Sequence, residues 1–231
     1  MLDNEIDDKA HILGHRKRLR EKFLKNNAEV FSDQELLEML LFLSKPRGDV
    51  KPLSKRLIKE FGTITKVFHA EPEQLLAVKD VGPSTLYILK LVKGIFTRVL
   101  KKEIENKVIL QSWSSLMDYL MVTQGHKAIE QFRVLYLNTK NILIADEPEE
   151  SGTIDQIQVY PREIVKRALF HGASALILVH NHPSGNANPS KLDIEMTKKI
   201  VNACATINVQ VHDHVIVTKD SFYSFKSNML I

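Results

Sequence analysis

The strongest constraint on the fold of this chain is an unbroken apolar run, ALILV, over residues 175–179. A short run of this kind is typical of a β-strand that is buried on both faces. Residues 161–170 before it have a helical pattern, with a proline in the first turn and Gly172 as the expected cap. Residues 190–207 after it are also expected to be helical. A buried strand between two helices predicts an α/β domain.

Further strands are expected in the same half of the chain. Residues 132–137, FRVLYL, favour a strand, and residues 138–141 are typical of a hairpin turn into residues 142–144. Another strand is expected over residues 209–218. The order strand–helix–strand–helix–strand predicts that the α/β domain covers residues 108–231.

The first half of the chain has the apolar spacing of helices, from residue 33 to residue 99. Ser32 is expected to cap a helix, with Glu35 completing a capping box three residues later. Gly62 has the position of a glycine that ends the next helix, and the pair Glu71-Pro72 opens a third. The charged residues 101–107 are typical of a helix end or a linker. We therefore predict an all-helical bundle with a basic N-terminal arm over residues 1–107.

The composition excludes several classes of protein. A chain of 231 residues forms one or two domains. A single cysteine, Cys204, excludes a disulfide scaffold and any multi-cysteine zinc or iron–sulfur site within the chain. No apolar stretch reaches the length of a membrane-spanning helix. The N-terminus is acidic and then basic, without the apolar core of a secretory signal. We expect a cytoplasmic protein.

The charge is unevenly distributed along the chain. Residues 1–107 carry a formal net charge of +5 and residues 108–231 a net charge of −1. The densest basic run is HRKRLR, at residues 15–20. A basic half beside a near-neutral half indicates a module that contacts a polyanion such as DNA, joined to one with another task. A solvated helix face would explain the same run without any partner.

Two histidines and an aspartate near the end of the expected buried strand have the spacing of a metal site. His180 and His182 are two residues apart, so they project from the same face of a strand. A turn-rich loop then leads to a helix, in which Asp193 lies one turn from Ser190. Two imidazoles and one carboxylate suit a divalent transition ion, zinc first, and leave a fourth position for water. Water bound to such an ion ionises near pH ~7 and becomes a nucleophile.

Each part of this group also has an ordinary structural explanation. A His-x-His pair on a strand is common without a metal. Ser190 and Asp193 form an ordinary capping box, in which the carboxylate accepts from the backbone N–H of Ser190. The combined spacing is what favours the metal site: His-x-His, seven residues, Ser, two residues, Asp.

This spacing resembles the motif of the JAMM (MPN-domain) metallohydrolases, which also use a separate upstream glutamate. The strings HNHPSG, PREIVKRAL and DHVIV resemble the RadC family in particular, a bacterial group long labelled as DNA-repair proteins. The strings GHRKRLREKFL, LLEMLLF and FGTITKVF extend the resemblance through most of the chain. The resemblance implies zinc held by His180, His182 and Asp193, on an MPN/JAMM domain with cytidine-deaminase-like layering over residues 108–231.

The resemblance also implies a glutamate as general base and a serine that stabilises an oxyanion. Glu130 stands at the start of an expected strand, where the family's glutamate stands. Glu147 is the alternative, together with Glu149 and Glu150, although these three lie in a polar turn typical of a solvated loop. The motif serine corresponds to Ser190, which would donate to the developing negative charge.

A second polar cluster, Asp213 and His214, lies on the last expected strand. Alternation places Asp213 on the same face as the valines at 209, 211, 215 and 217, so a buried carboxylate there would need a partner. We expect this cluster to have a supporting role, such as orienting one ligand histidine, rather than to bind the metal. His171 and His126 are expected to lie outside the site.

In the helical half, residues 75–86 (LLAVKDVGPSTL) resemble a helix-hairpin-helix, a motif whose turn offers backbone N–H groups to a DNA phosphate. Asp80 occupies the place of the first glycine, and Leu86 replaces a small residue of the following helix. A hairpin that only packs against its neighbours is therefore the alternative. DNA contact through it would be insensitive to sequence and strongly salt-dependent.

Three functions remain open from the sequence. The first is a zinc-dependent JAMM-type metallopeptidase or isopeptidase, in which zinc-bound water attacks an amide carbonyl of a protein or peptide. The second is a DNA-associated repair or recombination factor whose zinc domain is catalytically idle. The third is a metal-dependent nuclease. The sequence does not identify the substrate.

Overall fold

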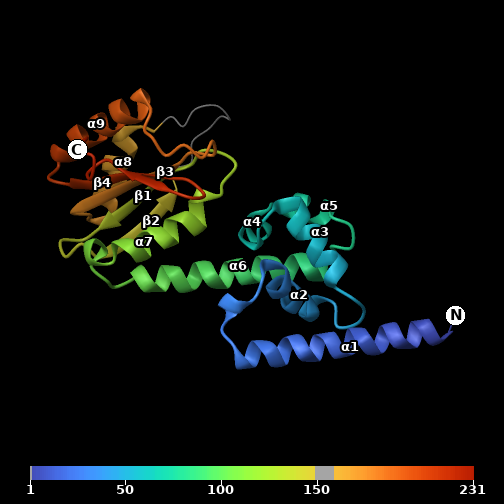
Figure 1. Cartoon of the computed structure of the whole chain (residues 1–231). Helices are drawn as coiled ribbons and strands as arrows, with labels where there is room; N and C mark the ends of the chain where they lie inside the picture. Colours follow the sequence, from blue (N-terminus) through green and yellow to red (C-terminus); the bar gives the residue numbers. More distant parts are fainter. Residues whose placement is uncertain (1, 149–158) are drawn as a thin grey trace. The chain divides into compact units, whose positions relative to one another are not determined.

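The computed structural model describes residues 2–148 and 159–231, with side chains described from residue 14 onward in the first range. The chain divides into two compact units, Met1–Phe96 and Thr97–Ile231. Figure 1 shows helices in the first unit and a sheet flanked by helices in the second. The division falls within helix α6 (Pro83–Ile104), N-terminal to the charged residues 101–107. The start of that charged stretch is therefore the last turn of a helix.

The N-terminal unit is helical, as predicted from residue 33 onward, whereas its first helix was predicted only as a basic arm. Its elements are α1 (Leu2–Lys25), a short 3-10 helix (Ala28–Val30), α2 (Asp33–Ser44), α3 (Lys51–Phe61), α4 (Ile64–His69), α5 (Pro72–Ala77) and the first part of α6. Ser32 and Glu35 form the predicted capping box at the start of α2. Gly62 ends α3 with a φ of +90°, a conformation that favours glycine. The six-residue α4 was not predicted as a separate helix, because it is too short to show a period of its own.

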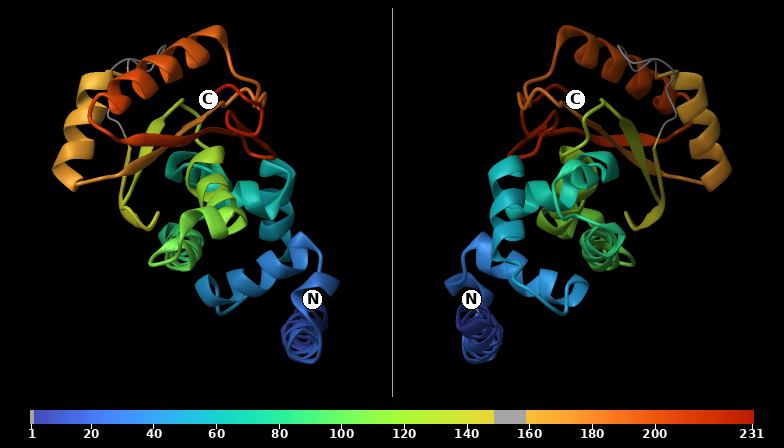
Figure 2. Two further views of the ribbon diagram at one scale, coloured as in Figure 1. Left: turned by 90° about the vertical axis from the view of Figure 1, so that its left-hand side faces the viewer. Right: turned by 90° about the vertical axis from the view of Figure 1, so that its right-hand side faces the viewer.

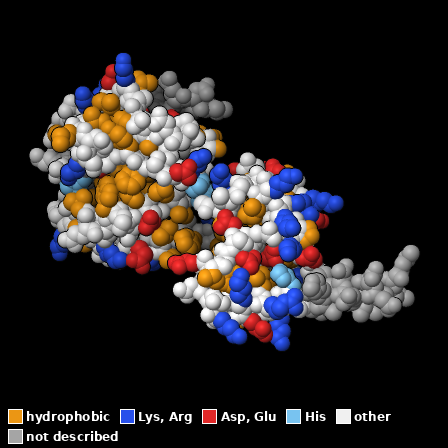
Figure 3. Space-filling model, in the orientation of Figure 1, with side chains coloured by type: hydrophobic (Ala, Val, Ile, Leu, Met, Phe, Trp, Pro, Cys, Tyr) orange, Lys and Arg blue, Asp and Glu red, His pale blue; other side chains and the backbone are white. Residues whose placement is uncertain are grey.

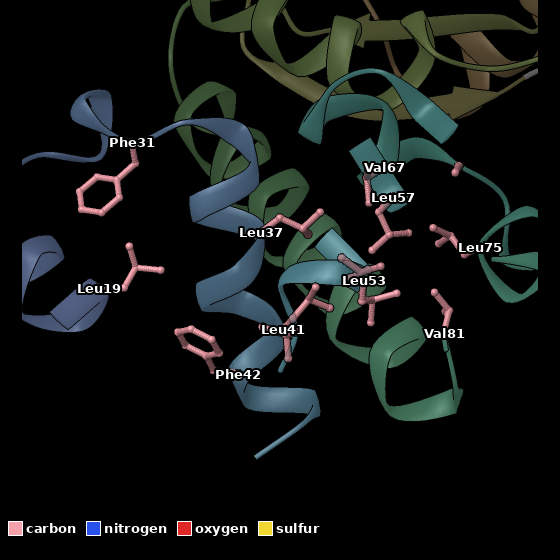
Figure 4. Close-up of a cluster of buried hydrophobic side chains, with 13 residues drawn as sticks. Leu19, Phe31, Leu37, Leu41, Phe42, Leu53, Leu57, Val67, Leu75 and Val81 are labelled. Carbon is pink, nitrogen blue, oxygen red and sulfur yellow. The ribbon is translucent and has the colours of Figure 1, made fainter. Parts of the chain in front are cut away.

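The core of the N-terminal unit is a cluster of aliphatic and phenylalanine side chains between these helices (Figure 4). Leu37 and Leu41 of α2 and Leu57 of α3 are fully buried in it. Leu75 of α5 and Leu89 of α6 complete the cluster from the other side. The apolar stripes that predicted the helices are therefore the faces that pack together.

Part of the basic run in α1 has a structural task. The guanidinium of Arg16 is buried and donates to the backbone carbonyls of Lys45, Pro46 and Gly48, just after the end of α2. These carbonyls have no partner within a helix, so Arg16 acts as a C-terminal cap. On the face seen in Figure 3, the basic side chains of this unit are interspersed with acidic ones.

The segment that resembles a helix-hairpin-helix joins α5 to α6. Asp80, which occupies the place of the motif's first glycine, has a left-handed φ of +70°. Its carboxylate pairs with Arg56 of α3. The turn therefore has the backbone conformation that usually requires glycine, and a salt bridge holds its side chain against α3.

The C-terminal unit contains a mixed five-stranded sheet in the order β2-β1-β3-β4-β5. The strands are β1 (Phe132–Leu137), β2 (Leu143–Pro148), β3 (Ala175–Asn181), β4 (Gln210–Val217) and β5 (Phe222–Ser224). β3 and β4 are parallel, whereas β1–β2, β1–β3 and β4–β5 are antiparallel. β3 is central and buried along its whole length, as its apolar run predicted. The short edge strand β5 was not predicted.

Helices cover both faces of this sheet, as the views in Figures 1 and 2 show. Helices α8 (Pro161–His171) and α9 (Lys191–Ala205) pack on one face, against alternate residues of β1 and β3. Helix α7 (Trp113–Leu120) and the end of α6 pack on the other face. The α/β prediction for this half is confirmed, although α7 was not foreseen.

A β-bulge in β4 changes which residues share a face. Leu176 of β3 pairs with Val211, whereas the next residue, Ile177, pairs with Asp213, so His212 is the extra residue. Val211 therefore packs on the α8–α9 face, and Val215 packs on the α7 face. The predicted single face containing Asp213 and all four valines is wrong, because simple alternation does not hold across a bulge.

Among the described residues, 2–148 and 159–231, no helix combines the length and the apolar character that crossing a membrane requires.

Candidate metal centre

Three side chains, from strand β3, the loop after it and helix α9, meet at the end of the central strand. His180 is the last residue but one of β3, His182 follows the strand, and Asp193 lies in the first turn of α9. One ligand atom from each of the three lies within 4.8 Å of the other two. The convergence that the motif spacing predicted is therefore present in the fold.

His182 stays in line with β3 although the strand has ended. Its backbone N–H donates to the carbonyl of Val217 on β4, at 3.0 Å, which extends the parallel ladder by one residue. The loop then turns at Gly185, which has a φ of +84°. This turn brings the carbonyl of Asn186 to 2.7 Å from Nδ1 of His182. Because a carbonyl can only accept, Nδ1 carries the proton and Nε2 offers its lone pair to the centre.

Asp193 is at once a helix cap and a member of the site. Its Oδ2 accepts from the backbone N–H of Ser190 at 2.7 Å, and its own N–H donates to Oγ of Ser190 at 3.2 Å. The same carboxylate lies beside both histidines. The capping box and the metal site are therefore not alternatives, because the cap holds the carboxylate in its position at the centre.

The distances between the three groups fit a tetrahedral ion. The Nε2 atoms of His180 and His182 are 2.9 Å apart, and Oδ1 and Oδ2 of Asp193 lie 3.3 and 3.6 Å from them, respectively. Zinc bonds of about 2.0–2.2 Å at the tetrahedral angle place neighbouring ligand atoms about 3.3–3.5 Å apart. The three groups therefore fit a zinc-sized ion with small adjustments.

The electrostatics of the group also favour a cation. Burial opposes ionisation of Asp193, but the neighbouring imidazoles of His180 and His182 prevail and hold its pKa well below the usual range. The hydrogen bond to Asp193 raises the pKa of His182, against the effect of partial burial. An ionised carboxylate beside two imidazoles makes the space between the three groups favourable for a cation.

The group opens onto a cavity of about 860 Å³. Its polar lining includes Glu130, Ser190 and Lys199, and its apolar lining includes Leu192 and Met196 of α9. A substrate that enters this cavity meets the three candidate ligands directly. In this respect the site has the open character of a catalytic metal centre rather than a closed structural one.

Glu130 lies in the cavity, and strand pairing explains why. Phe132, the first residue of β1, pairs antiparallel with His180, so Glu130, two residues before it, comes opposite His182, two residues after His180. Glu130 is close enough to His182 to contribute to its raised pKa.

Asn181, the residue between the two histidines, anchors the segment that carries Glu130. Its buried side chain accepts from the N–H of Gln131 at 2.8 Å and donates to the carbonyls of Ile129 and Lys127 at 3.1 and 3.3 Å. Asn181 was not predicted to be a functional residue. The signal in the sequence was its position between two candidate ligands, because strand alternation points its side chain to the face of the sheet opposite to theirs.

Glu147 has a different environment. It lies on β2 and forms an ion pair with Arg167 of α8, with Nε of Arg167 at 2.7 Å from Oε2, and it also contacts His171. Glu147 is not among the described residues that line the cavity. Glu149 and Glu150 lie outside the described residues. Of the described glutamates proposed as a base, Glu130 is therefore the one that faces the candidate ligands.

The cluster of Asp213 and His214 separates into two roles. Asp213 accepts from the N–H groups of His214 and Lys226 and from the hydroxyl of Ser224, so it holds β5 and the turn that follows it. His214 instead points to the site, with Nε2 at 2.8 Å from Nδ1 of His180. Burial lowers the pKa of His214 well below its ordinary value. His171 and His126 do not line the cavity.

An α/β sheet with helices on both faces and a His-x-His…Asp group at the end of its central strand defines a metal-site domain of the JAB type. In agreement with this, the model of the RadC-like JAB domain matches residues 110–230, and the model of the UPF0758 N-terminal family matches residues 12–87. A UPF0758 protein of Ruegeria pomeroyi is 46% identical over 218 residues, which cover 94% of this chain and 97% of the relative. The chain therefore belongs to the RadC family, as the sequence motifs predicted.

Proposed function

We propose that this protein is a zinc-dependent hydrolase of the JAMM type that cleaves an amide or isopeptide bond in a protein or peptide. The observation that carries the proposal is the convergence of His180, His182 and Asp193 on one point at the floor of an open cavity. The choice of an amide bond rests on membership of a JAB-domain family. The residues themselves support metal-assisted hydrolysis in general.

Each residue of the site has a role that its geometry supports. The Nε2 atoms of the two histidines and the carboxylate of Asp193 would hold the ion. When bound, zinc polarises a carbonyl and makes water a stronger nucleophile at neutral pH. Glu130 would take a proton from the attacking water at its carboxylate and deliver it to the leaving nitrogen.

Ser190 would stabilise the negative charge that develops on the carbonyl oxygen. Its Oγ accepts from the N–H of Asp193, which leaves the hydroxyl proton free to donate to a group in the cavity. A donor aimed at such an oxyanion is worth about 2.7–4 kcal/mol in the transition state. Because Ser190 also caps α9, its position is set by the helix that carries Asp193.

The proposal is tested by metal analysis and by two matched substitutions. We expect the purified protein to bind zinc with a stoichiometry near one per chain and Asp193→Ala to bind little. Glu130→Gln should keep its zinc and lose about 10²–10⁴-fold in turnover of amide substrates, because only the proton acceptor is removed. The matched control, Glu147→Gln, should keep both zinc and turnover. Suitable probes are a panel of fluorogenic peptide amides and isopeptide-linked conjugates.

Several results would contradict the proposal. Absence of zinc from the wild-type protein after zinc is supplied would remove the metal site. Full amide turnover by Glu130→Gln would remove the assigned base. Zinc-dependent cleavage of DNA without amide hydrolysis would favour a nuclease. Salt-dependent retention of the full chain on DNA, with zinc bound but no hydrolysis of any probe, would favour a DNA-associated factor with an idle zinc domain.

A further inference from the structure

A second buried histidine lies behind the proposed zinc site. His214 of β4 is fully buried, and its ring packs between Phe225, with ring centroids 4.5 Å apart, and Phe132, at 5.7 Å. In this apolar surrounding both ring nitrogens have a polar partner. Nε2 lies 2.8 Å from Nδ1 of His180, and Nδ1 lies 2.6 Å from the hydroxyl oxygen of Thr197.

The hydroxyl of Thr197 fixes the direction of these hydrogen bonds. Thr197 lies one turn after Asp193 on α9, and its Oγ1 is 2.6 Å from the backbone carbonyl of Asp193. A carbonyl can only accept, so the single hydroxyl proton of Thr197 is directed to it. The hydroxyl oxygen must then accept from His214, so Nδ1 of His214 carries a proton. Full burial among aromatic side chains favours the uncharged ring, which leaves Nε2 without a proton.

The same logic continues to His180. With its proton on Nδ1, His214 has a lone pair on Nε2, and it accepts from Nδ1–H of His180. His180 is then left with the lone pair on Nε2, the atom that faces His182 and Asp193. With the series Asp193 carbonyl, Thr197, His214, His180 ordered in this way, the Nε2 atoms of both candidate ligand histidines, 2.9 Å apart, have lone pairs, an arrangement that a cation between them would stabilise.

The two candidate ligand histidines are thus prepared by different means. His182 is fixed by Asn186, four residues away in its own loop, whereas His180 is fixed by His214, which comes from the neighbouring strand. The hydrogen bonds of His214 also join β3, β4 and α9. Helix α9, which carries Asp193, is therefore connected through His214 to the ring of His180, and Asp193 faces that ring.

We propose that His214 is a positioning residue for the zinc site, which acts by holding His180 in the Nδ1–H tautomer, and that Thr197 sets the orientation of His214. The inference rests on the proposed zinc site and adds two residues to it. A neutral histidine needs its free lone pair on the coordinating nitrogen. Loss of partners behind metal ligands typically weakens metal binding 10–100-fold.

The test measures zinc affinity of the full chain by competition with a chelator. His214→Phe removes the acceptor but keeps an aromatic ring in the aromatic surrounding, and we expect the Kd for zinc to rise about 10–100-fold. His214→Gln, whose amide can accept from His180 and donate to Thr197, should restore much of the affinity. Thr197→Val, which replaces the hydroxyl with a methyl group of similar size, should weaken binding, and Thr197→Ser should restore it.

The matched control is His212→Gln. His212 is also on β4, but its ring contacts Oδ1 of Asn141 rather than the site. We expect its Kd for zinc to equal that of the wild type. A second, direct readout is the nitrogen NMR spectrum of histidine rings in the wild-type protein, which should show the proton of His180 on Nδ1 both before and after zinc is added.

Two outcomes would overturn this inference while leaving the proposed function intact. One is folded His214→Phe or Thr197→Val protein that binds zinc as tightly as the wild type. The other is an NMR spectrum that places the proton of zinc-free His180 on Nε2. Failure of the wild-type protein to bind zinc would instead contradict the proposed function itself, and this inference with it.

Discussion

At the scale of single residues, several side chains of the site combine a structural and a chemical task. Asp193 caps α9 with one oxygen while its carboxylate faces two imidazoles. Asn181 uses both ends of its amide to hold the segment that carries Glu130. Such double use explains why a short motif can define a site: the same contacts that fold the loop also aim its ligands.

Glu147 gives a prediction that separates stability from catalysis. Hydrogen bonding from Arg167 is the largest effect on Glu147, and it lowers the pKa of this carboxyl below 4.5 despite partial burial. We expect Glu147→Gln to lower the free energy of unfolding by about 1 kcal/mol at neutral pH, because the pair is only partly shielded from solvent.

The effect of Glu147 should depend on pH in a defined direction. A carboxyl whose pKa is lower in the folded state contributes stability above its unfolded pKa, and this contribution is lost as the pH falls through the folded pKa. Urea unfolding of both proteins at neutral pH and near pH ~3 should therefore show a difference that shrinks towards zero in acid. A difference of equal size at both pH values would show that the ion pair is not its cause.

At the scale of elements, close approach of two segments places a strict demand on one glycine. Gly125 ends a π-helical turn (Met121–Gly125), and a Cβ atom there would lie 2.5 Å from the backbone carbonyl oxygen of Thr218, just after β4. Neither backbone segment can move as freely as a side chain. The contact lets the π-helical turn that follows α7 approach the end of β4, whose Val217 carbonyl accepts from the N–H of His182.

We therefore expect Gly125→Ala to lower the free energy of unfolding by about 1–3 kcal/mol through overpacking. Gly94→Ala is the matched control, because Gly94 is exposed within α6 and no atom lies within 4 Å of its added Cβ. This second change should stabilise the protein by up to about 1 kcal/mol through helix propensity. Denaturant unfolding of both variants checks the pair, and equal effects of the same sign would contradict the argument.

At the scale of the whole molecule, the chain has separate hydrophobic cores in its two units. Leu57 belongs to the core of the N-terminal unit. The proposed zinc ligands all lie in the C-terminal unit, close to the core beneath α8 and α9. A ligand stabilises the unit that binds it, by about 2.7 kcal/mol when its free concentration is 100 times Kd.

Calorimetry of the full chain should therefore show two unfolding transitions. Zinc should raise the Tm of only one of them, that of the C-terminal unit. Leu57→Ala should lower the Tm of the other transition, because truncation of a fully buried leucine costs about 2–5 kcal/mol of stability. The zinc-sensitive transition should stay where it is in this variant. A single transition that responds both to zinc and to Leu57→Ala would show that the units unfold as one.

What the sequence determined by itself is local. Helices α2 and α3, the capping boxes at Ser32 and Ser190, and the buried strand β3 follow from apolar period and from caps between residues close in the chain. The grouping of His180, His182 and Asp193 also follows from one strand, one loop and one helix start. Residues that are close in the chain have few alternative arrangements relative to one another, so their spacing predicts which of them meet.

The tertiary structure alone decided the rest. The order of strands places Glu130 beside the histidines and Glu147 against α8, although Glu147 is nearer to them in sequence. The bulge at His212 decides which residues of β4 share a face, because one extra residue reverses every later side chain. His214 reaches His180 only because β3 and β4 are neighbours, across 34 positions of sequence. Pairing between distant strands is set by how the whole sheet packs, and no local pattern records it.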